Sequence, residues 1–93
     1  MSKIVVDPSS NAVLPVSGNK QYCYGGIVVA LGESWESGQY YGMWHVINGQ
    51  KGFKATPIIT ASGITIAAAS NGIKVTSPNA TTYVYAYYIG RAY

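Results

Sequence analysis

The side chains that could carry out covalent or acid–base chemistry are few in this chain, and they are scattered along it. They are one cysteine, one histidine and three acids, at Cys23, His45, Asp7, Glu33 and Glu36. Nucleophilic catalysis needs a nucleophile, a base and a group that orients the base. Cys23 and His45 could meet in space, but no acid stands at a spacing that would complete the set. We therefore predict that the protein is not an enzyme.

Metal and cofactor binding are disfavoured for the same reason. One cysteine and one histidine cannot build a zinc site within a chain. Glu33 and Glu36 flank Trp35 in a loop expected at residues 32–38, where two carboxylates and an aromatic ring could bind a sugar or Ca²⁺. A solvated loop with an anchoring tryptophan accounts for the same residues. No glycine-rich phosphate loop follows a strand and opens a helix, so we expect no cofactor.

Ordinary structural roles are expected for the single cysteine and the single histidine. Cys23 stands between Tyr22 and Tyr24 in a strand, which favours a buried and inert thiol. His45 falls on the same strand face as neighbouring apolar residues, which is typical of a histidine at the edge of a core. A lone cysteine cannot form a disulfide within the chain.

The aromatic residues are the most informative candidates for binding. The chain has nine tyrosines and two tryptophans, and these side chains combine a large contact area with a polar group. They can form protein interfaces or stack on sugar rings, and about half of them are expected simply to fill a core. The interface or ligand candidates are Trp35, Tyr40, Trp44, Tyr83, Tyr85 and Tyr87.

Composition limits the classes of protein to which the chain can belong. Of its 93 residues 48% are hydrophobic and 10% charged, against about 25% charged in an average soluble domain. This balance excludes a disordered chain, and leucine at only two positions excludes a coiled coil. The net charge is +3, but the six basic residues are spread out instead of forming a stripe. Nucleic acid is therefore not an expected partner, and a single-strand binder that stacks bases on tyrosine is the third alternative.

The elements that position these side chains are predicted to be strands. Apolar residues alternate in short runs separated by Gly, Pro, Asn and Ser, and no segment has a capped helical stripe. The expected strands are residues 4–6, 22–31, 39–47, 52–60, 64–69, 73–76 and 81–89. About seven short strands with frequent turns predict an all-β protein, an antiparallel β-sandwich of the Ig-like or compact jelly-roll type.

Glycine, proline and asparagine predict particular turns and irregularities. Asn71-Gly72 favours a hairpin between the strands around Ile66 and Val75, and Asn48-Gly49 is a second hairpin signal. Pro57 indicates an edge strand or a bulge. The two consecutive glycines at residues 25–26 indicate a bulge or a bend in their strand.

The first part of the chain reads as an extended N-terminal arm. Residues 7–20 contain two prolines within Ser-, Asn- and Gly-rich sequence, which argues against a central strand. The predicted organisation is an arm at residues 1–20 and a single β-sandwich domain at residues 21–93. Only a short apolar run follows Lys3, so no signal peptide is expected, and no run reaches the roughly 18 apolar residues of a membrane span.

The strand at residues 81–89 has no charge on either face. One face carries tyrosines at 83, 85 and 87, and the other carries Thr82, Val84, Ala86 and Tyr88. Exposing an uncharged, aromatic strand to water is unfavourable, so we expect the core to cover one face and a partner or loop to cover the other.

The C-terminal third resembles the small β-domains of tailed-bacteriophage virions. The resemblance lies in GITIAAASNGIKVT at residues 63–76 and YVYAYYIGRAY at residues 83–93. It implies a capsid decoration, head-fibre or tail-fibre-tip protein, made in the host cytoplasm and located in the virion. The end of the last strand is also similar to trimeric jelly-roll domains of the complement C1q and tumour-necrosis-factor type. Neither resemblance assigns a functional residue.

Two functions follow from these observations. The first is a non-enzymatic virion protein that contacts other virion proteins and copies of itself. The alternative is a carbohydrate-binding module or receptor-binding fibre tip that binds a host surface glycan. No membrane partner is expected.

Overall fold

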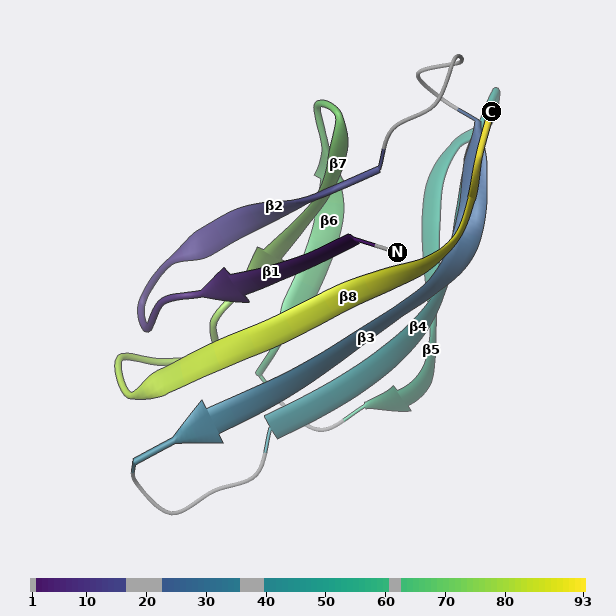
Figure 1. Ribbon diagram of the computed structural model, residues 1–93. Coiled ribbons are helices and arrows are strands. Elements are labelled where there is room, and N and C mark those ends of the chain that lie inside the picture. Colours follow the sequence, from purple (N-terminus) through teal and green to yellow (C-terminus); the bar gives the residue numbers. More distant parts are fainter. Residues whose placement is uncertain (1, 17–22, 36–39, 61–62) are drawn as a thin grey trace.

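The computed structural model describes residues 2–16, 23–35, 40–60 and 63–93, and these residues form strands and turns without a helix (Figure 1). The all-β prediction is therefore confirmed. The strands are β1 (Ser2–Val6), β2 (Asn11–Pro15), β3 (Tyr24–Ser34), β4 (Tyr40–Gly49), β5 (Gly52–Thr60), β6 (Thr65–Ala69), β7 (Gly72–Thr76) and β8 (Thr82–Ala92).

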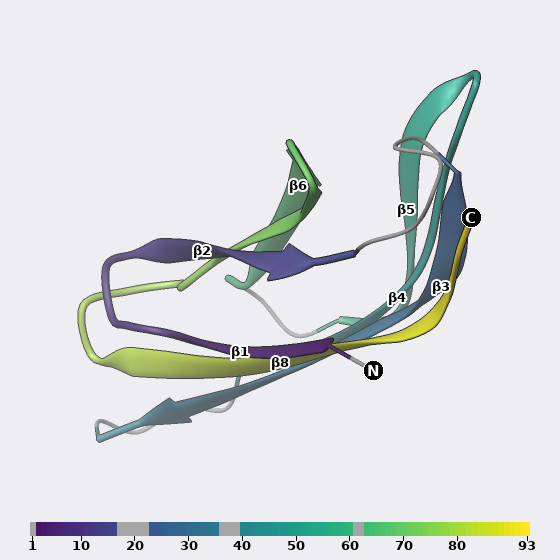
Figure 2. The same cartoon turned by 45° about the horizontal axis from the view of Figure 1, so that its top comes forward.

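The strands form two antiparallel sheets that pack as a sandwich. A five-stranded sheet has the order β1-β8-β3-β4-β5, and a three-stranded sheet has the order β2-β7-β6. Figure 2 shows the smaller sheet lying over one face of the larger one. The ends of β3, β4, β5 and β8 near the C-terminus curve out of the plane of the larger sheet (Figures 1 and 2). The larger sheet therefore has one covered face, here called the inner face, and one uncovered face, the outer face.

The core fills the space between the sheets. The larger sheet contributes Val28, Val46 and Val84 from its inner face, and the smaller sheet contributes Ile73 and Val75, all with no exposed surface. Fully burying each such side chain contributes about 1.5–3 kcal/mol. Successive side chains of a strand point to opposite faces, so the alternation in β4 and β8 places every second residue in this core, as predicted.

Residues 2–6 and 11–15 belong to the sandwich, so the prediction of a separate arm is wrong for them, while residues 17–20 lie outside the described part of the chain. β1 pairs with β8 at the edge of one sheet, and β2 pairs with β7 at the edge of the other. Val6 is 1% exposed and Leu14 has no exposed surface, so both strands contribute to the core. The prolines act as expected in one respect, because Pro15 ends an edge strand and interrupts no central ladder. Burial of the apolar residues between the two prolines, above all Leu14, favoured a strand here in spite of the turn-forming residues around them.

Both predicted hairpins occur, but their turns lie earlier or later in the chain than predicted. β6 and β7 form a hairpin in which Ile66 lies opposite Val75, as predicted. Ala69 pairs with Gly72, so the turn lies at residues 70–71, not at Asn71-Gly72, and Asn71 has a left-handed φ of 66°. In the β4–β5 hairpin, Gly49 pairs with Gly52, so the turn lies at residues 50–51, not at Asn48-Gly49. Gly52 there has a φ of 92°, a conformation that glycine adopts without strain.

Proline and glycine mark irregularities in the larger sheet. Pro57 lies in the edge strand β5, opposite a register shift between Met43 and Trp44, so both predicted features occur. The pairing of β3 with both neighbours runs through residues 25–26 without a bulge. Gly26 instead lies opposite Gly90, where an added Cβ would come within 2.6 Å of the partner Cα. The close approach of these two strands requires glycine.

Candidate functional site

The residues that could carry chemistry do not come together. Cys23 is exposed just before β3, so the expectation of a buried thiol is wrong. Its carbonyl oxygen accepts a hydrogen bond from the Tyr93 amide at 2.8 Å. His45 is exposed and lies opposite Ile27 of β3. Ile27 follows Cys23 by four residues, which is about 13 Å of extended chain, so the thiol and the imidazole are far apart. Within the described ranges, no group of three or more His, Cys, Asp or Glu residues could hold a metal ion.

The outer face of the five-stranded sheet gathers large apolar side chains that water reaches. Every strand of the sheet contributes, and each of the following residues is more than a third exposed. They are Val5, Leu31, Tyr41, Ile47, Ile59, Tyr83, Tyr85 and Ile89. A monomeric protein seldom exposes an apolar patch of this extent, which usually marks an interaction site.

The strand register joins these side chains into a continuous band. Val5 lies opposite Tyr85, Tyr85 opposite Leu31, and Leu31 opposite Tyr41, which makes one apolar row across β1, β8, β3 and β4. Tyr87 lies in the next row, and an open hollow of about 460 Å³ extends over β1 and β8 beside these tyrosines. A sheet with one solvated face normally alternates apolar with polar residues, and the outer face does not.

Three charged side chains of the outer face lie towards its two ends. Glu33 lies opposite Tyr83 at one end, and Arg91 and Lys54 lie in β8 and β5 towards the other end. Eight residues separate Glu33 from Gly25, the partner of Arg91, which is about 26 Å along β3. A fourth charge, Lys3, is exposed opposite Tyr87 in the edge strand β1, beside the apolar row.

The six aromatic candidates fall into two groups. Tyr83, Tyr85 and Tyr87 all point from β8 to the outer face, as the alternation predicted. Trp35 is 66% exposed beyond the end of β3, and its ring centroid lies 6.2 Å from that of Tyr83. These four residues could contact a partner together.

Tyr40 and Trp44 lie on the inner face instead. Trp44 is only 7% exposed and packs in the core, where its indole occupies the space beside Gly42. Tyr40 is half-buried, and its hydroxyl oxygen accepts a hydrogen bond from the side chain of Asn79 at 3.1 Å. Trp35 and Trp44 therefore do not form a common platform for a sugar ring.

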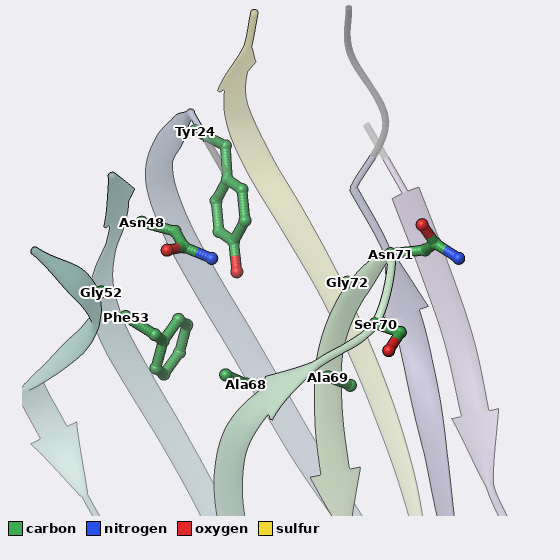
Figure 3. A pocket seen from close by; sticks show the side chains of 9 residues that line it. All are labelled: Tyr24, Asn48, Gly52, Phe53, Ala68, Ala69, Ser70, Asn71 and Gly72. Carbon is green, nitrogen blue, oxygen red and sulfur yellow. The ribbon is translucent and has the colours of Figure 1, made fainter. Parts of the chain in front are cut away.

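A cleft that the sequence did not reveal opens between the two sheets (Figure 3). It has a volume of about 420 Å³ and is lined by the β4–β5 hairpin on one side and the β6–β7 hairpin on the other. Tyr24, Asn48 and Phe53 point into it from the larger sheet, and the small residues Ala68 and Ala69 form much of the opposite wall. Of this lining, Asn48, Asn71 and Gly72 drew attention in the sequence, but only as turn residues.

The hydroxyl group of Tyr24 lies at the floor of this cleft. It has almost no accessible surface and no hydrogen-bond partner among the described residues. Burial raises the pKa of the Tyr24 phenol above 10.0, and a hydrogen-bonding interaction with the nearby Asn48 side chain, too long or poorly aligned to form a regular hydrogen bond, partly offsets this. The Tyr24 ring packs edge-on against Tyr88, with 6.1 Å between the centroids. Such a buried hydroxyl costs free energy, and in the described part of the chain it is the one buried side-chain nitrogen or oxygen atom without a regular hydrogen bond.

Comparison of the chain with family models, curated proteins and solved structures finds no match. The described part of the chain contains no helix with the length and apolar character needed to cross a membrane.

Proposed function

We propose that this protein is a non-enzymatic assembly protein whose copies associate through the outer face of the five-stranded sheet. The supporting observation is the apolar row formed by Val5, Tyr85, Leu31 and Tyr41, which crosses four strands and lies in contact with water. Covering this row removes apolar surface from water, which is the main driving force for protein association.

The size of the outer face suits a stable protein partner. Five strands spaced by about 4.8 Å and eight steps of about 3.3 Å along β3 outline a face of about 19 by 26 Å. This is about 500 Å² in projection, before side-chain relief is counted. A standard interface buries about 800 Å² of accessible surface on each partner. A second face of the same size would cover it well.

The charges favour a second copy of the chain as the partner. A twofold axis lying between two outer faces, perpendicular to the strands, places each end of one face over the opposite end of the other. Glu33 of one copy then meets the row of Arg91 and Lys54 in its partner. The apolar row through Leu31 lies over the partner's row through Ile27 and Ile89. Charge pairs at the rim of an apolar interface fix its orientation.

The place of this assembly, on our proposal, is a virus particle, in a decoration or fibre subunit. The support is the resemblance of residues 63–76 and 83–93 to small virion β-domains, together with an outer face suited to a lattice or a fibre. Immunogold electron microscopy of particles released by cells that make the chain tests this. We expect label on the particles, and label confined to unassembled protein would contradict the virion role.

Leu31→Asp tests the association itself, because Leu31 lies at the centre of the apolar row. Burying an unpaired carboxylate in an interface costs several kcal/mol, so we expect the dissociation constant from sedimentation equilibrium to rise at least about a hundredfold. Val13→Asp is the matched control, because Val13 is 41% exposed on the smaller sheet. A wild-type protein that stays monomeric at high micromolar concentration would overturn the proposal.

A charge exchange tests the proposed twofold arrangement. Glu33→Lys should weaken association because it places like charges together, and combining it with Arg91→Glu should restore part of the loss. If the double variant is weaker than both single variants, the two residues do not meet across the interface, and the twofold arrangement is wrong.

A further inference from the structure

We infer that the cleft between the β4–β5 and β6–β7 hairpins is a binding site for a small neutral sugar ring. This site lies on the inner side of the larger sheet, away from the outer face, so it goes beyond the proposed assembly function. Its floor and walls come from β3, β4, β5 and the β6–β7 hairpin.

The dimensions of the cleft suit a ligand of this kind. Its volume of about 420 Å³ falls within the roughly 300–1,000 Å³ of typical small-molecule sites. The wall formed by Ala68, Ala69 and Gly72 carries little side-chain volume, which keeps the cleft open. Phe53 and Tyr24 face this wall with their rings (Figure 3). A flat ring can therefore enter between an aromatic side and an aliphatic side.

The polar groups of the cleft are uncharged. Among the lining residues that the structure describes there is no Asp, Glu, Lys or Arg, while Asn48, Ser70 and Asn71 supply amide and hydroxyl groups. An ionised ligand would lose its hydration without gaining an opposite charge. A pyranose instead has an apolar C–H face for an aromatic ring and hydroxyl groups for the amides and hydroxyls. The lining therefore favours a neutral polyol ring over a phosphate, a carboxylate or an amine.

The Tyr24 hydroxyl is the group that lacks a partner when the cleft is empty. It can donate one hydrogen bond and accept others, and although the Asn48 side chain interacts with it, it forms no regular hydrogen bond with the described residues. Asn48 is half-buried and points into the same space in Figure 3, so turning its side chain gives a ligand access to the phenol. A sugar hydroxyl that bonds to both groups would satisfy the unpaired phenol. Tyr24 and Asn48 are thus the specificity residues, and Phe53 is the stacking residue.

Titration of the wild-type protein with methyl glucoside, methyl galactoside, methyl mannoside and N-acetylglucosamine, followed by amide NMR, tests the site. We expect at least one of these probes, at millimolar concentration, to shift the amides of Asn48, Phe53 and residues 69–72. The outer-face amides should not move. Glucuronate serves as the charged comparison and should bind more weakly than the corresponding neutral glucoside.

Tyr24→Phe separates a binding role from a structural one. The variant should keep or raise the melting temperature, because it removes an unpaired buried hydroxyl, and it should weaken sugar binding about three- to tenfold. Tyr85→Phe removes a hydroxyl from the outer face and should leave binding unchanged. Phe53→Ala should weaken binding at least about tenfold.

Three binding results would overturn the inference. They are no cleft shift with any neutral probe, tighter binding of glucuronate than of the glucoside, and equal sugar affinity in Tyr24→Phe and the wild type. A melting temperature that falls clearly in Tyr24→Phe would show that the hydroxyl serves the fold, which also contradicts it.

Discussion

The side-chain amide of Asn79 donates a hydrogen bond to the hydroxyl oxygen of Tyr40 at 3.1 Å, across 39 positions of the sequence. The Oδ1 atom of the same asparagine accepts from the Thr81 amide at 2.9 Å and from the Thr82 hydroxyl at 2.7 Å. The Asn79 carbonyl oxygen accepts from the Ser9 amide at 2.9 Å. One residue thus connects the turn before β8 with β4 and with the β1–β2 turn.

Asn79→Ala should lower the free energy of unfolding by about 2–4 kcal/mol, measured by urea denaturation. The substitution removes the acceptor of the Thr82 hydroxyl, and Thr82 has no exposed surface, so a buried donor loses its partner. Asn79→Asp keeps the acceptor and alters only the bond to Tyr40, so it should cost less than half as much. Equal losses in both variants would mean that the bond to Tyr40 dominates.

Gly72→Ala should cost about 1–3 kcal/mol through overlap of backbones, not through strain in φ. The left-handed residue of this hairpin is Asn71, while a Cβ on Gly72 would overlap the Leu14 carbonyl and lie 2.8 Å from a Val13 methyl carbon. Gly49→Ala is the control, because a Cβ there meets nothing within 4 Å. Its melting temperature should stay close to that of the wild type. A Gly72→Ala variant as stable as the wild type would contradict the close pairing of β2 with β7.

Leu14→Ala should cost about 2–5 kcal/mol, whereas Val13→Ala should change stability by less than about 0.5 kcal/mol. The two residues are neighbours in β2, but Leu14 has no exposed surface and Val13 is 41% exposed. Thermal denaturation followed by circular dichroism measures both. If both variants lose less than about 0.5 kcal/mol of stability, β2 does not pack in the core and the prediction of an N-terminal arm is right.

Stability should fall as the pH rises above about 10, because two tyrosines hold their protons more tightly in the folded protein. Burial raises the pKa of Tyr24 and of Tyr88 above 10.0, and the proximity of the two rings raises that of Tyr88 further. Above pH 10 the unfolded chain releases these protons first, so ionisation favours unfolding. The stabilisation is complete below pH 10 and is lost as the pH passes the folded-state values.

Ultraviolet absorbance of tyrosinate checks this order of ionisation. Tyr24→Phe and Tyr88→Phe should each remove part of the absorbance that develops latest in an alkaline titration of the folded protein. The stability of the double variant should depend less on pH above 10 than that of the wild type. An unchanged late phase in both single variants would contradict the assignment.

Local patterns were enough to determine most of the strands and which residues of a strand share a face, but they missed β2, which ends at Pro15. Alternation in the segment ending at Ile89 predicted which tyrosines share a face, and Asn71-Gly72 predicted the β6–β7 hairpin, because period-two patterning and left-handed φ are local properties. The absence of charge from the last strand also predicted a face that needs a cover. The outer face and its tyrosines could therefore be anticipated from the sequence.

Only the tertiary structure decided how these pieces pair. Residues 2–6 and 11–15 became sheet edges because Val6 and Leu14 gain more from burial in the core than the prolines cost at an edge. Trp44 went to the core and Tyr83 to the outer face because the sheet order decides which face is covered. The cleft around Tyr24 exists because two distant hairpins diverge there, and no local pattern encodes the distance between them.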